Sequence, residues 1–472
     1  MVTFNNGLTP TGRLVVGLMG PLIGRENQRI GFVMEVTGVG NLLPKAPLLQ
    51  ICSLNANLQT FPQSIWYYRF MNYIKRELEP VLASLVAQFP AVSLTGPRQT
   101  GKSTLLRHLF PEAKYISFDD PLARQLARED PERLLDMDTS RILLDEIQFV
   151  PELLSRIKIR IDNNRQAKGR YLLMGSQQFT LMKNLGDSLA GRIALLELLP
   201  LSFSEWARAG LQKSALESFT QSCLRGLFPE PALNLDMDAS RWFSSYIQTY
   251  LERDIRTIFD IGNLHDFERF LQLLASRCAQ ELHLTSLASD VGVAVNTVKK
   301  WISLLEACRI LYLLPPYHQN LGKRITKAPK VYFLDLGLVS FLTGIRTAEH
   351  LLAGPMGGAL FENYCVQEAV KVFTNAGVPP RLYFLRKGTE FEVDLLLDNP
   401  GGGVTAFEIK LSQTPKAAFA SSLHKFHKDF GLLKIQTMGL VSLSKESGPL
   451  SQTVSHFCFS DFLKCIKAAA IL

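Results

Sequence analysis

The stretch that most constrains the fold of this chain is residues 96–103, which match the pattern G-x-x-x-x-G-K-[ST] without a gap. An apolar run at residues 91–94 precedes the match, and residues 104–106 can open a helix after it. A strand, a glycine-rich loop and a helix in this order form a cradle whose backbone amides and helix dipole attract phosphate. The motif therefore predicts a nucleotide site on an α/β sheet.

The contacts expected of this loop follow from its residue types. Lys102 would reach the β- and γ-phosphates, and the Ser103 hydroxyl would ligate Mg²⁺. We expect ATP and Mg²⁺ as cofactors. The residues expected to bind the nucleotide are Gly96, Pro97, Arg98, Gln99, Thr100, Gly101, Lys102, Ser103 and Thr104. An ordinary glycine-rich turn that caps a helix is the competing interpretation.

A second acidic element follows the apolar residues 142–144. Asp145 would join the Mg²⁺ shell, directly or through water, and Glu146 would polarise the attacking water as a general base. An acidic pair after a strand is often only a cap, but here it follows an independent phosphate-loop signal. The two elements together predict nucleotide hydrolysis.

Two further residues are candidates for the same site. Ser176, at the end of the next strand, can contact the γ-phosphate or orient the water, or it is a simple turn serine. Arg192 can sense the γ-phosphate in the same or a neighbouring subunit, or it is a solvated surface arginine. The predicted catalytic set is Glu146, Lys102, Arg192 and Ser176.

The surrounding pattern alternates strands with helices. Strands are expected at residues 115–118, 141–144 and 171–174, and helices at 73–86, 124–135 and 153–163. This alternation predicts a parallel α/β sheet whose active groups gather at the carboxyl ends of the strands. Residues 1–65 show no sustained period and are left unassigned. One hypothesis is that translation begins at Met71.

Several ordered segments make the chain resemble the prokaryotic AAA+-type ATPases that carry a C-terminal domain of unknown function. The resemblance covers about residues 71–465. Its segments are residues 96–103, 117–121, 142–146, 173–176, 189–192, 200–203, 250–255 and 330–338. It implies a P-loop ATPase domain at 66–206, a helical and winged-helix domain at 207–318, and an α+β restriction-endonuclease-like domain at 319–472. It supplies no biological pathway.

A helix–turn–helix pattern covers residues 284–291 and 296–307, with the turn at Gly292. On the second helix, Asn296, Thr297, Lys299 and Lys300 are expected to face outward, where they can contact DNA phosphates and base edges. The alternative is a winged helix used for packing or for subunit contact.

The C-terminal region holds a set of carboxylates with a lysine. Asp394 and Glu408 could share a divalent metal, Lys410 could position water or stabilise charge, and Glu362 could complete the shell. The spacing resembles the PD-(D/E)xK nuclease constellation, although Val393 stands where that pattern has proline. The alternative is a retained fold with surface ion pairs.

Composition excludes some classes and leaves others open. The seven cysteines are odd in number and widely spaced, which argues against a disulfide framework and favours a reducing cytoplasm. No apolar run reaches the roughly 18 residues of a membrane span. The net charge of +8 permits DNA binding without requiring it.

These observations favour a cytoplasmic Mg²⁺-dependent ATPase that couples nucleotide state to DNA or to an unknown protein partner, and that can form a homo-oligomer. The alternatives are an ATP-gated metal-dependent nuclease and a nucleotide-binding switch with little turnover.

Overall fold

The computed structural model describes residues 3–8, 14–19, 32–36, 73–136, 140–175, 189–211, 214–251, 264–317, 328–430 and 433–471. The chain divides into two units, Met1–Asn72 and Tyr73–Leu472. The first unit, left unassigned by the sequence, contains an antiparallel sheet in the order β1-β2-β3. Its strands are β1 (Thr3–Leu8), β2 (Leu14–Met19) and β3 (Phe32–Val36).

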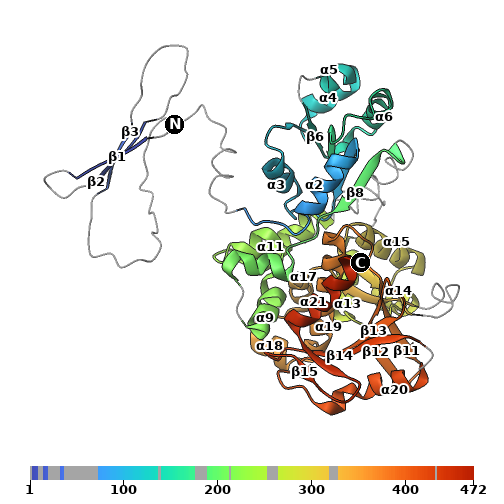
Figure 1. Cartoon of the computed structure of the whole chain (residues 1–472). Coiled ribbons are helices and arrows are strands. Elements are labelled where there is room, and N and C mark those ends of the chain that lie inside the picture. Colours follow the sequence, from blue (N-terminus) through green and yellow to red (C-terminus); the bar gives the residue numbers. More distant parts are fainter. Residues whose placement is uncertain are drawn as a thin grey trace, which may run out of the picture. The chain divides into compact units, whose positions relative to one another are not determined.

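The second unit begins with a five-stranded sheet in the order β5-β6-β7-β4-β8 (Figure 1). All its strand pairs are parallel, which confirms the predicted parallel α/β sheet of P-loop type. Its strands are β4 (Ala91–Thr95), β5 (Lys114–Ser117), β6 (Ile142–Asp145), β7 (Tyr171–Met174) and β8 (Ile193–Glu197).

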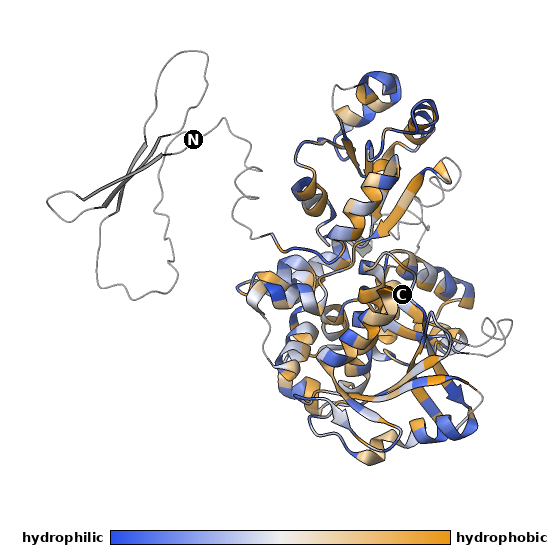
Figure 2. Ribbon diagram, viewed as in Figure 1, coloured by the Kyte–Doolittle hydropathy of each residue, from blue (hydrophilic) through white to orange (hydrophobic). Residues whose placement is uncertain are grey.

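Helices cover both faces of this sheet because neighbouring strand residues point to opposite sides. On β6, Leu143 joins one apolar cluster and Leu144 joins the other. The helices are α2 (Glu79–Gln88), α3 (Lys102–Leu109), α4 (Pro121–Glu129), α5 (Pro131–Leu135) and α6 (Leu153–Asn163). Figure 2 shows the resulting contrast between the largely hydrophobic β8 and the hydrophilic outer faces of the helices.

Two predicted helices differ from the structure at their ends. The helix expected from residue 73 starts at Glu79, next to Pro80, because proline is favoured in the first helical turn. The helix expected over 124–135 is two helices, α4 and α5. Asp130 ends the first and caps the second, and Pro131 cannot continue a helix that has already begun.

A helical region follows the parallel sheet. In it, α14 and α15 form the expected pair of helices around Gly292, which has a φ of 88°. Next, β9 (Leu311–Leu314) pairs antiparallel with β10 (Lys330–Phe333). The predicted boundary after residue 318 lies outside the described residues. The helices are α8 (Phe203–Trp206), α9 (Ala215–Arg225), α10 (Pro229–Leu233), α11 (Ala239–Tyr246), α13 (Leu264–Ser276), α14 (Leu284–Val291), α15 (Val295–Ala307), α17 (Leu336–Thr343) and α18 (Ala348–Ala353).

The C-terminal part is a mixed sheet in the order β11-β12-β13-β14-β16-β15. The long helix α19 (Gly357–Asn375) is almost wholly buried and shares one apolar core with the sheet, with α21 and with the preceding helical region. The remaining elements are β11 (Leu382–Lys387), β12 (Phe391–Asp398), β13 (Val404–Ile409), α20 (Ser421–Asp429), β14 (Ile435–Ser442), β15 (Gly448–Pro449), β16 (Ser455–Cys458) and α21 (Phe459–Ile471).

Candidate functional site

The predicted motif, residues 96–103, covers the loop that joins β4 to α3 at the carboxyl edge of the parallel sheet and the first two residues of α3. Three of its residues have positive φ: Gly96 at 133°, Gln99 at 62° and Gly101 at 89°. Two features exclude a side chain at Gly96: its positive φ, and the carbonyl oxygen of Leu198, which would lie 2.2 Å from a Cβ. The backbone is therefore wound into the concave form that presents amides to an anion.

Lys102 is the first residue of α3, and its side chain contacts this loop. Its Nζ donates to the carbonyl oxygens of Gly96 at 3.0 Å and Pro97 at 2.7 Å. Burial lowers the pKa of Lys102 to about 8, and the nearby negative charges of Glu146 and Asp145 act against this decrease. A buried ammonium group held only by carbonyl oxygens is well prepared to exchange them for an anionic ligand.

The two motifs meet at Asp145, the last residue of β6. Ser103 Oγ, 42 residues earlier in the chain, donates to Asp145 Oδ2 at 3.0 Å. The Tyr115 hydroxyl donates to the same oxygen at 2.7 Å. Burial raises the pKa of Asp145, an effect that these two hydrogen bonds oppose. A hydroxyl and a carboxylate in contact are the hard oxygen donors that suit Mg²⁺.

Glu146 directly follows this pair and has a φ of 54°, in the left-handed region. Its backbone N–H donates to Asp145 Oδ1 at 3.0 Å, and its carboxylate accepts a hydrogen bond from Gln148 Nε2. The two consecutive acidic residues thus have different partners: two hydroxyl groups contact Asp145, and a side-chain amide contacts Glu146.

Two further residues, Ser176 and Arg192, were predicted for this site. Ser176 lies outside the described residues. Arg192 pairs with Asp162 at 2.8 Å and precedes β8, whose first residue is in register with Ala91 at the start of β4. Arg192 is thus at the amino edge of the sheet. The five residues of β4, which extend over about 16 Å, separate that edge from the loop. A role in the site of its own subunit does not fit this position, whereas a role at a neighbouring subunit's site stays a prediction.

Arg76, which no motif predicted, contacts the phosphate loop. Its Nη1 donates to the carbonyl oxygen of Thr100 at 2.9 Å, and its Nη2 donates to that of Leu199 at 2.7 Å. Its Nε forms an ion pair with Glu205 at 3.0 Å, in which the side chains are 5% and 0% exposed. Only long-range contacts identify this residue, because nothing near it in the sequence resembles a site.

A second polar group is formed by the C-terminal sheet and α19, and it contains the four residues predicted for this region. Lys410 Nζ lies 2.6 Å from Glu408 Oε1 and 3.9 Å from Asp394 Oδ2. Glu362 on α19 accepts from Lys330 at 2.8 Å and from Tyr332 at 2.6 Å. Burial raises the pKa of Glu408 to about 8 and that of Glu362 to about 7. Glu408 Oε2 is buried and has no hydrogen-bond partner.

Lys330, on β10, was not predicted and changes the character of this group. Its side chain is 3% exposed and contacts both Glu362 and Glu392. Two ammonium groups, from Lys330 and Lys410, thus neutralise part of the carboxylate charge. Within the described part of the chain, no three His, Cys, Asp or Glu side chains are placed to hold a metal ion.

The predicted DNA contacts lie on α15. Asn296, Lys299 and Lys300 are exposed and Thr297 is half-buried, while Val298 on the opposite face is buried. The helix thus presents a polar face outward, as expected, and its DNA contact stays a prediction. No helix in the described ranges combines the length and apolar character that crossing a membrane requires.

Comparison with known families matches three segments of the chain. A model described as "AAA domain" matches residues 88–207, which include all five strands of the parallel sheet and the phosphate loop. Two models described as domains of unknown function, DUF8612 and DUF4143, match residues 216–349 and 357–459. The chain therefore contains an AAA-type P-loop domain, followed by a helical region and a separate mixed-sheet domain.

Among similar proteins, an uncharacterized protein of Mycobacterium tuberculosis is 29% identical over 383 residues, covering 80% of this chain and 82% of the relative. An uncharacterized protein of Methanocaldococcus jannaschii is 21% identical, with coverage of 71% and 78%. Among solved structures, the Walker-type ATPase PABY2304 of Pyrococcus abyssi aligns with a TM-score of 0.38 at 14% identity, covering 57% of this chain and 96% of that one.

Proposed function

We propose that this protein is a Mg²⁺-dependent ATPase of the AAA+ type whose nucleotide state controls binding of DNA or of a protein partner. The observation that carries the proposal is the 3.0 Å contact between Ser103 and Asp145. Two motifs that are independent in sequence supply the hydroxyl and the carboxylate of one divalent-cation site, next to a loop shaped for phosphate.

The residues of the loop have separate roles in this proposal. The loop amides and Lys102 bind the β- and γ-phosphates, for which Lys102 leaves the carbonyl oxygens of Gly96 and Pro97. Ser103 and Asp145 hold Mg²⁺, which when bound neutralises phosphate charge. Glu146 accepts the proton of the attacking water.

The proposed coupling to the rest of the chain is supported by buried polar contacts. Arg76 joins the Thr100 carbonyl of the loop to Glu205, and Glu205 Oε2 accepts from the backbone N–H of Ser202 at 2.9 Å. The next residue, Phe203, donates its N–H to Glu368 on α19 at 2.7 Å. A change in the loop can thus reach α19 through contacts that solvent does not screen.

Two buried side chains of α19, Glu368 and Lys371, hold the helix against residues 201–203. Lys371 Nζ donates to the carbonyl oxygen of Leu201 at 3.0 Å and to Glu368 at 2.8 Å, and both side chains are 1% exposed. Burial raises the pKa of Glu368, and the Lys371 charge opposes this. Glu362 lies on the same helix, less than two turns away. The series of buried contacts that starts at the nucleotide loop therefore reaches the helix that carries Glu362.

The test is steady-state ATP hydrolysis with and without duplex DNA, single-stranded DNA and RNA. Wild type should turn over ATP only with Mg²⁺. Glu146→Gln should keep ATP binding and lose turnover by about 10²–10⁴-fold, the usual contribution of a general base. Lys102→Ala should weaken binding. The matched control is Glu349→Gln, an exposed carboxylate on α18. Unchanged hydrolysis in both site variants would contradict the assignment.

A second candidate function is an ATP-gated nuclease. It is favoured by the proximity of Asp394, Glu408 and Lys410 and by the buried, unpartnered Glu408 Oε2. Carboxylate oxygens are suitable ligands for a divalent cation, although Lys410 contacts both acidic residues and no third such side chain among the described residues is placed to complete a metal site. Metal-dependent cleavage of plasmid that is abolished by Asp394→Ala would support this function. The absence of cleavage with Mg²⁺ or Mn²⁺, in the presence of ATP, would rule it out.

A further inference from the structure

The segment after the acidic pair is held in an unusual conformation. Glu146 has a φ of 54°, a region that costs a residue with a side chain about 1 kcal/mol or more. A short 3₁₀ helix, Ile147–Phe149, follows it and is closed by the hydrogen bond from Phe149 N–H to the carbonyl oxygen of Glu146 at 3.1 Å. Strain of this kind persists only where the surroundings fix the backbone.

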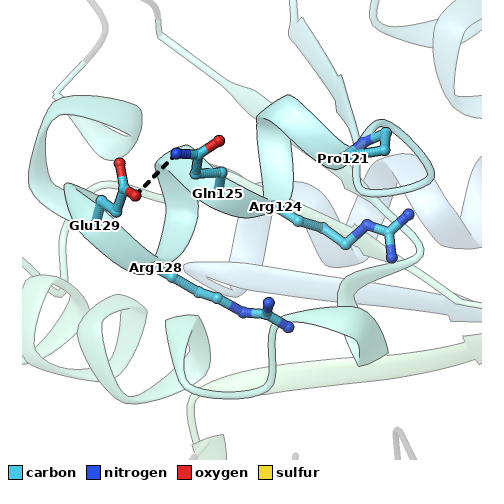
Figure 3. Close-up of a pocket in the computed structure, with 5 residues that line it drawn as sticks. All are labelled: Pro121, Arg124, Gln125, Arg128 and Glu129. Atoms are coloured by element: carbon cyan, nitrogen blue, oxygen red, sulfur yellow. Dashed lines mark hydrogen bonds between the residues drawn. The ribbon is translucent and has the colours of Figure 1, made fainter.

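Two arginines of α4 fix this segment from outside. Arg128 Nη2 donates to the carbonyl oxygen of Phe149 at 3.4 Å, and the Arg124 guanidinium lies over the Phe149 ring at 5.2 Å from its centre. Figure 3 shows both side chains extending from one side of α4. They line a surface hollow with a volume of about 420 Å³. From inside, Ile147 and Val150 are fully buried. The segment is thus anchored on two sides.

Gln148 is the middle residue of this 3₁₀ helix. Of its two polar side-chain atoms, Nε2 has a hydrogen-bond partner and Oε1 has none. Its Nε2 donates to Glu146 Oε2. Its Oε1 is buried and has no hydrogen-bond partner, in a residue that is 7% exposed. Leaving a buried amide oxygen without a partner costs about 1–3 kcal/mol, so the arrangement is unfavourable for folding alone. An apolar side chain of similar size would serve packing better.

We propose that Gln148 is a positioning residue for ATP hydrolysis. This proposal rests on the function proposed above. The amide N–H of Gln148 holds the Glu146 carboxylate in one orientation, and its Oε1 accepts a hydrogen bond from the same water that Glu146 deprotonates. The water oxygen forms a bond to the γ-phosphorus and the bond to the bridging oxygen breaks. The electron pair of the broken bond leaves with ADP, and the water proton passes to Glu146. Gln148 changes no bond and acts by orienting the base and the water.

The test compares Gln148→Leu with wild type, Glu146→Gln and the double variant. Gln148→Leu keeps the side-chain volume and removes both polar atoms. We expect kcat to fall about 10–100-fold, while KM and the affinity for Mg²⁺-ATP stay within about twofold, since the residue does not touch the nucleotide. In single-turnover measurements, Gln148→Leu should add no further loss to Glu146→Gln, because the two residues act as one unit.

A matched control exists on α4. Gln125 Nε2 donates to Glu129 Oε1 at 2.9 Å, which is the same type of contact on an exposed face (Figure 3). Gln125→Leu should leave both kcat and KM unchanged. If Gln148→Leu does not fold, Gln148→Glu carries the same test. It keeps the shape of the side chain but sets a second carboxylate against Glu146, and should lower kcat at least as far.

The outcomes separate this inference from the proposed function. Wild-type hydrolysis together with a Gln148→Leu kcat within twofold of wild type would overturn the role of Gln148 alone. So would a loss of ATP affinity that parallels the loss of kcat, because that would show general damage to the site. No hydrolysis by wild type would overturn both proposals.

Discussion

Arg76 offers the sharpest test of how the nucleotide loop is built. Its guanidinium group is 5% exposed and holds two backbone carbonyl oxygens, of Thr100 and Leu199, and the fully buried Glu205. Arg76→Met keeps most of the side-chain volume and removes the charge. Because Glu205 would then be a buried carboxylate without its cation, we expect a loss of about 3–5 kcal/mol in the free energy of unfolding.

The assay is urea unfolding followed by tryptophan fluorescence, to which the buried Trp206 contributes, together with ATP titration. The double variant Arg76→Met with Glu205→Gln should be destabilised by less than the sum of the single variants, because each removes the other's unpaired charge. ATP affinity should fall about tenfold in Arg76→Met, since the Thr100 carbonyl loses its donor.

The matched control is Arg241→Met, an arginine that is 90% exposed and pairs with Asp238. It should leave the urea midpoint unchanged. If Arg76→Met shifted the midpoint no more than this control, the buried support of the loop would be refuted. If it lowered stability but left ATP affinity untouched, Arg76 would support the fold without supporting the loop.

Two further predictions concern local geometry and pH. Gly96→Ala should destabilise the chain by about 1–3 kcal/mol and abolish ATP binding, because its φ is 133° and its Cβ would lie 2.2 Å from a carbonyl oxygen. Gly358→Ala, with open space around it, should cost nothing in thermal melting and ATP titration. Burial lowers the pKa of His456, whose Nε2 forms hydrogen bonds with two serine hydroxyls. As the pH falls, this imidazole is therefore protonated in the unfolded chain before it is protonated in the folded protein. Wild type should therefore lose more stability than His456→Gln between about pH 7 and pH 5 in urea unfolding at each pH, and parallel curves would contradict this.

The sequence predicted the parts of the fold that rest on local pattern. The strand, loop and helix around Lys102 and the acidic end of β6 are encoded by short motifs, and the parallel sheet follows from their alternation. The contact between Ser103 and Asp145 was predictable because parallel strands bring their carboxyl ends to one edge. Asp394, Glu408 and Lys410 were grouped by their spacing alone, and they lie near one another because β12 pairs antiparallel with β13.

What the sequence did not predict depends on contacts between distant segments. Arg76 meets Leu199 across 123 residues, and no local pattern marks either one. Lys330 reaches Glu362 from a strand of the preceding region, so its burial could not be read from its neighbours. Gln148 is different, because it lies two residues after Glu146 and its polar side chain on a buried turn was a usable signal. Arg192 was assigned by its position in a motif, without the strand direction that places it at the opposite edge.

The most direct test of the account is calorimetric titration of the full chain with ATP, with and without Mg²⁺, for wild type and Lys102→Ala. We predict that one ATP binds per wild-type chain, that Mg²⁺ strengthens binding, and that Lys102→Ala weakens it at least tenfold. No heat of binding with wild type, or equal affinity in the two proteins, would contradict the claim that this loop is a nucleotide site.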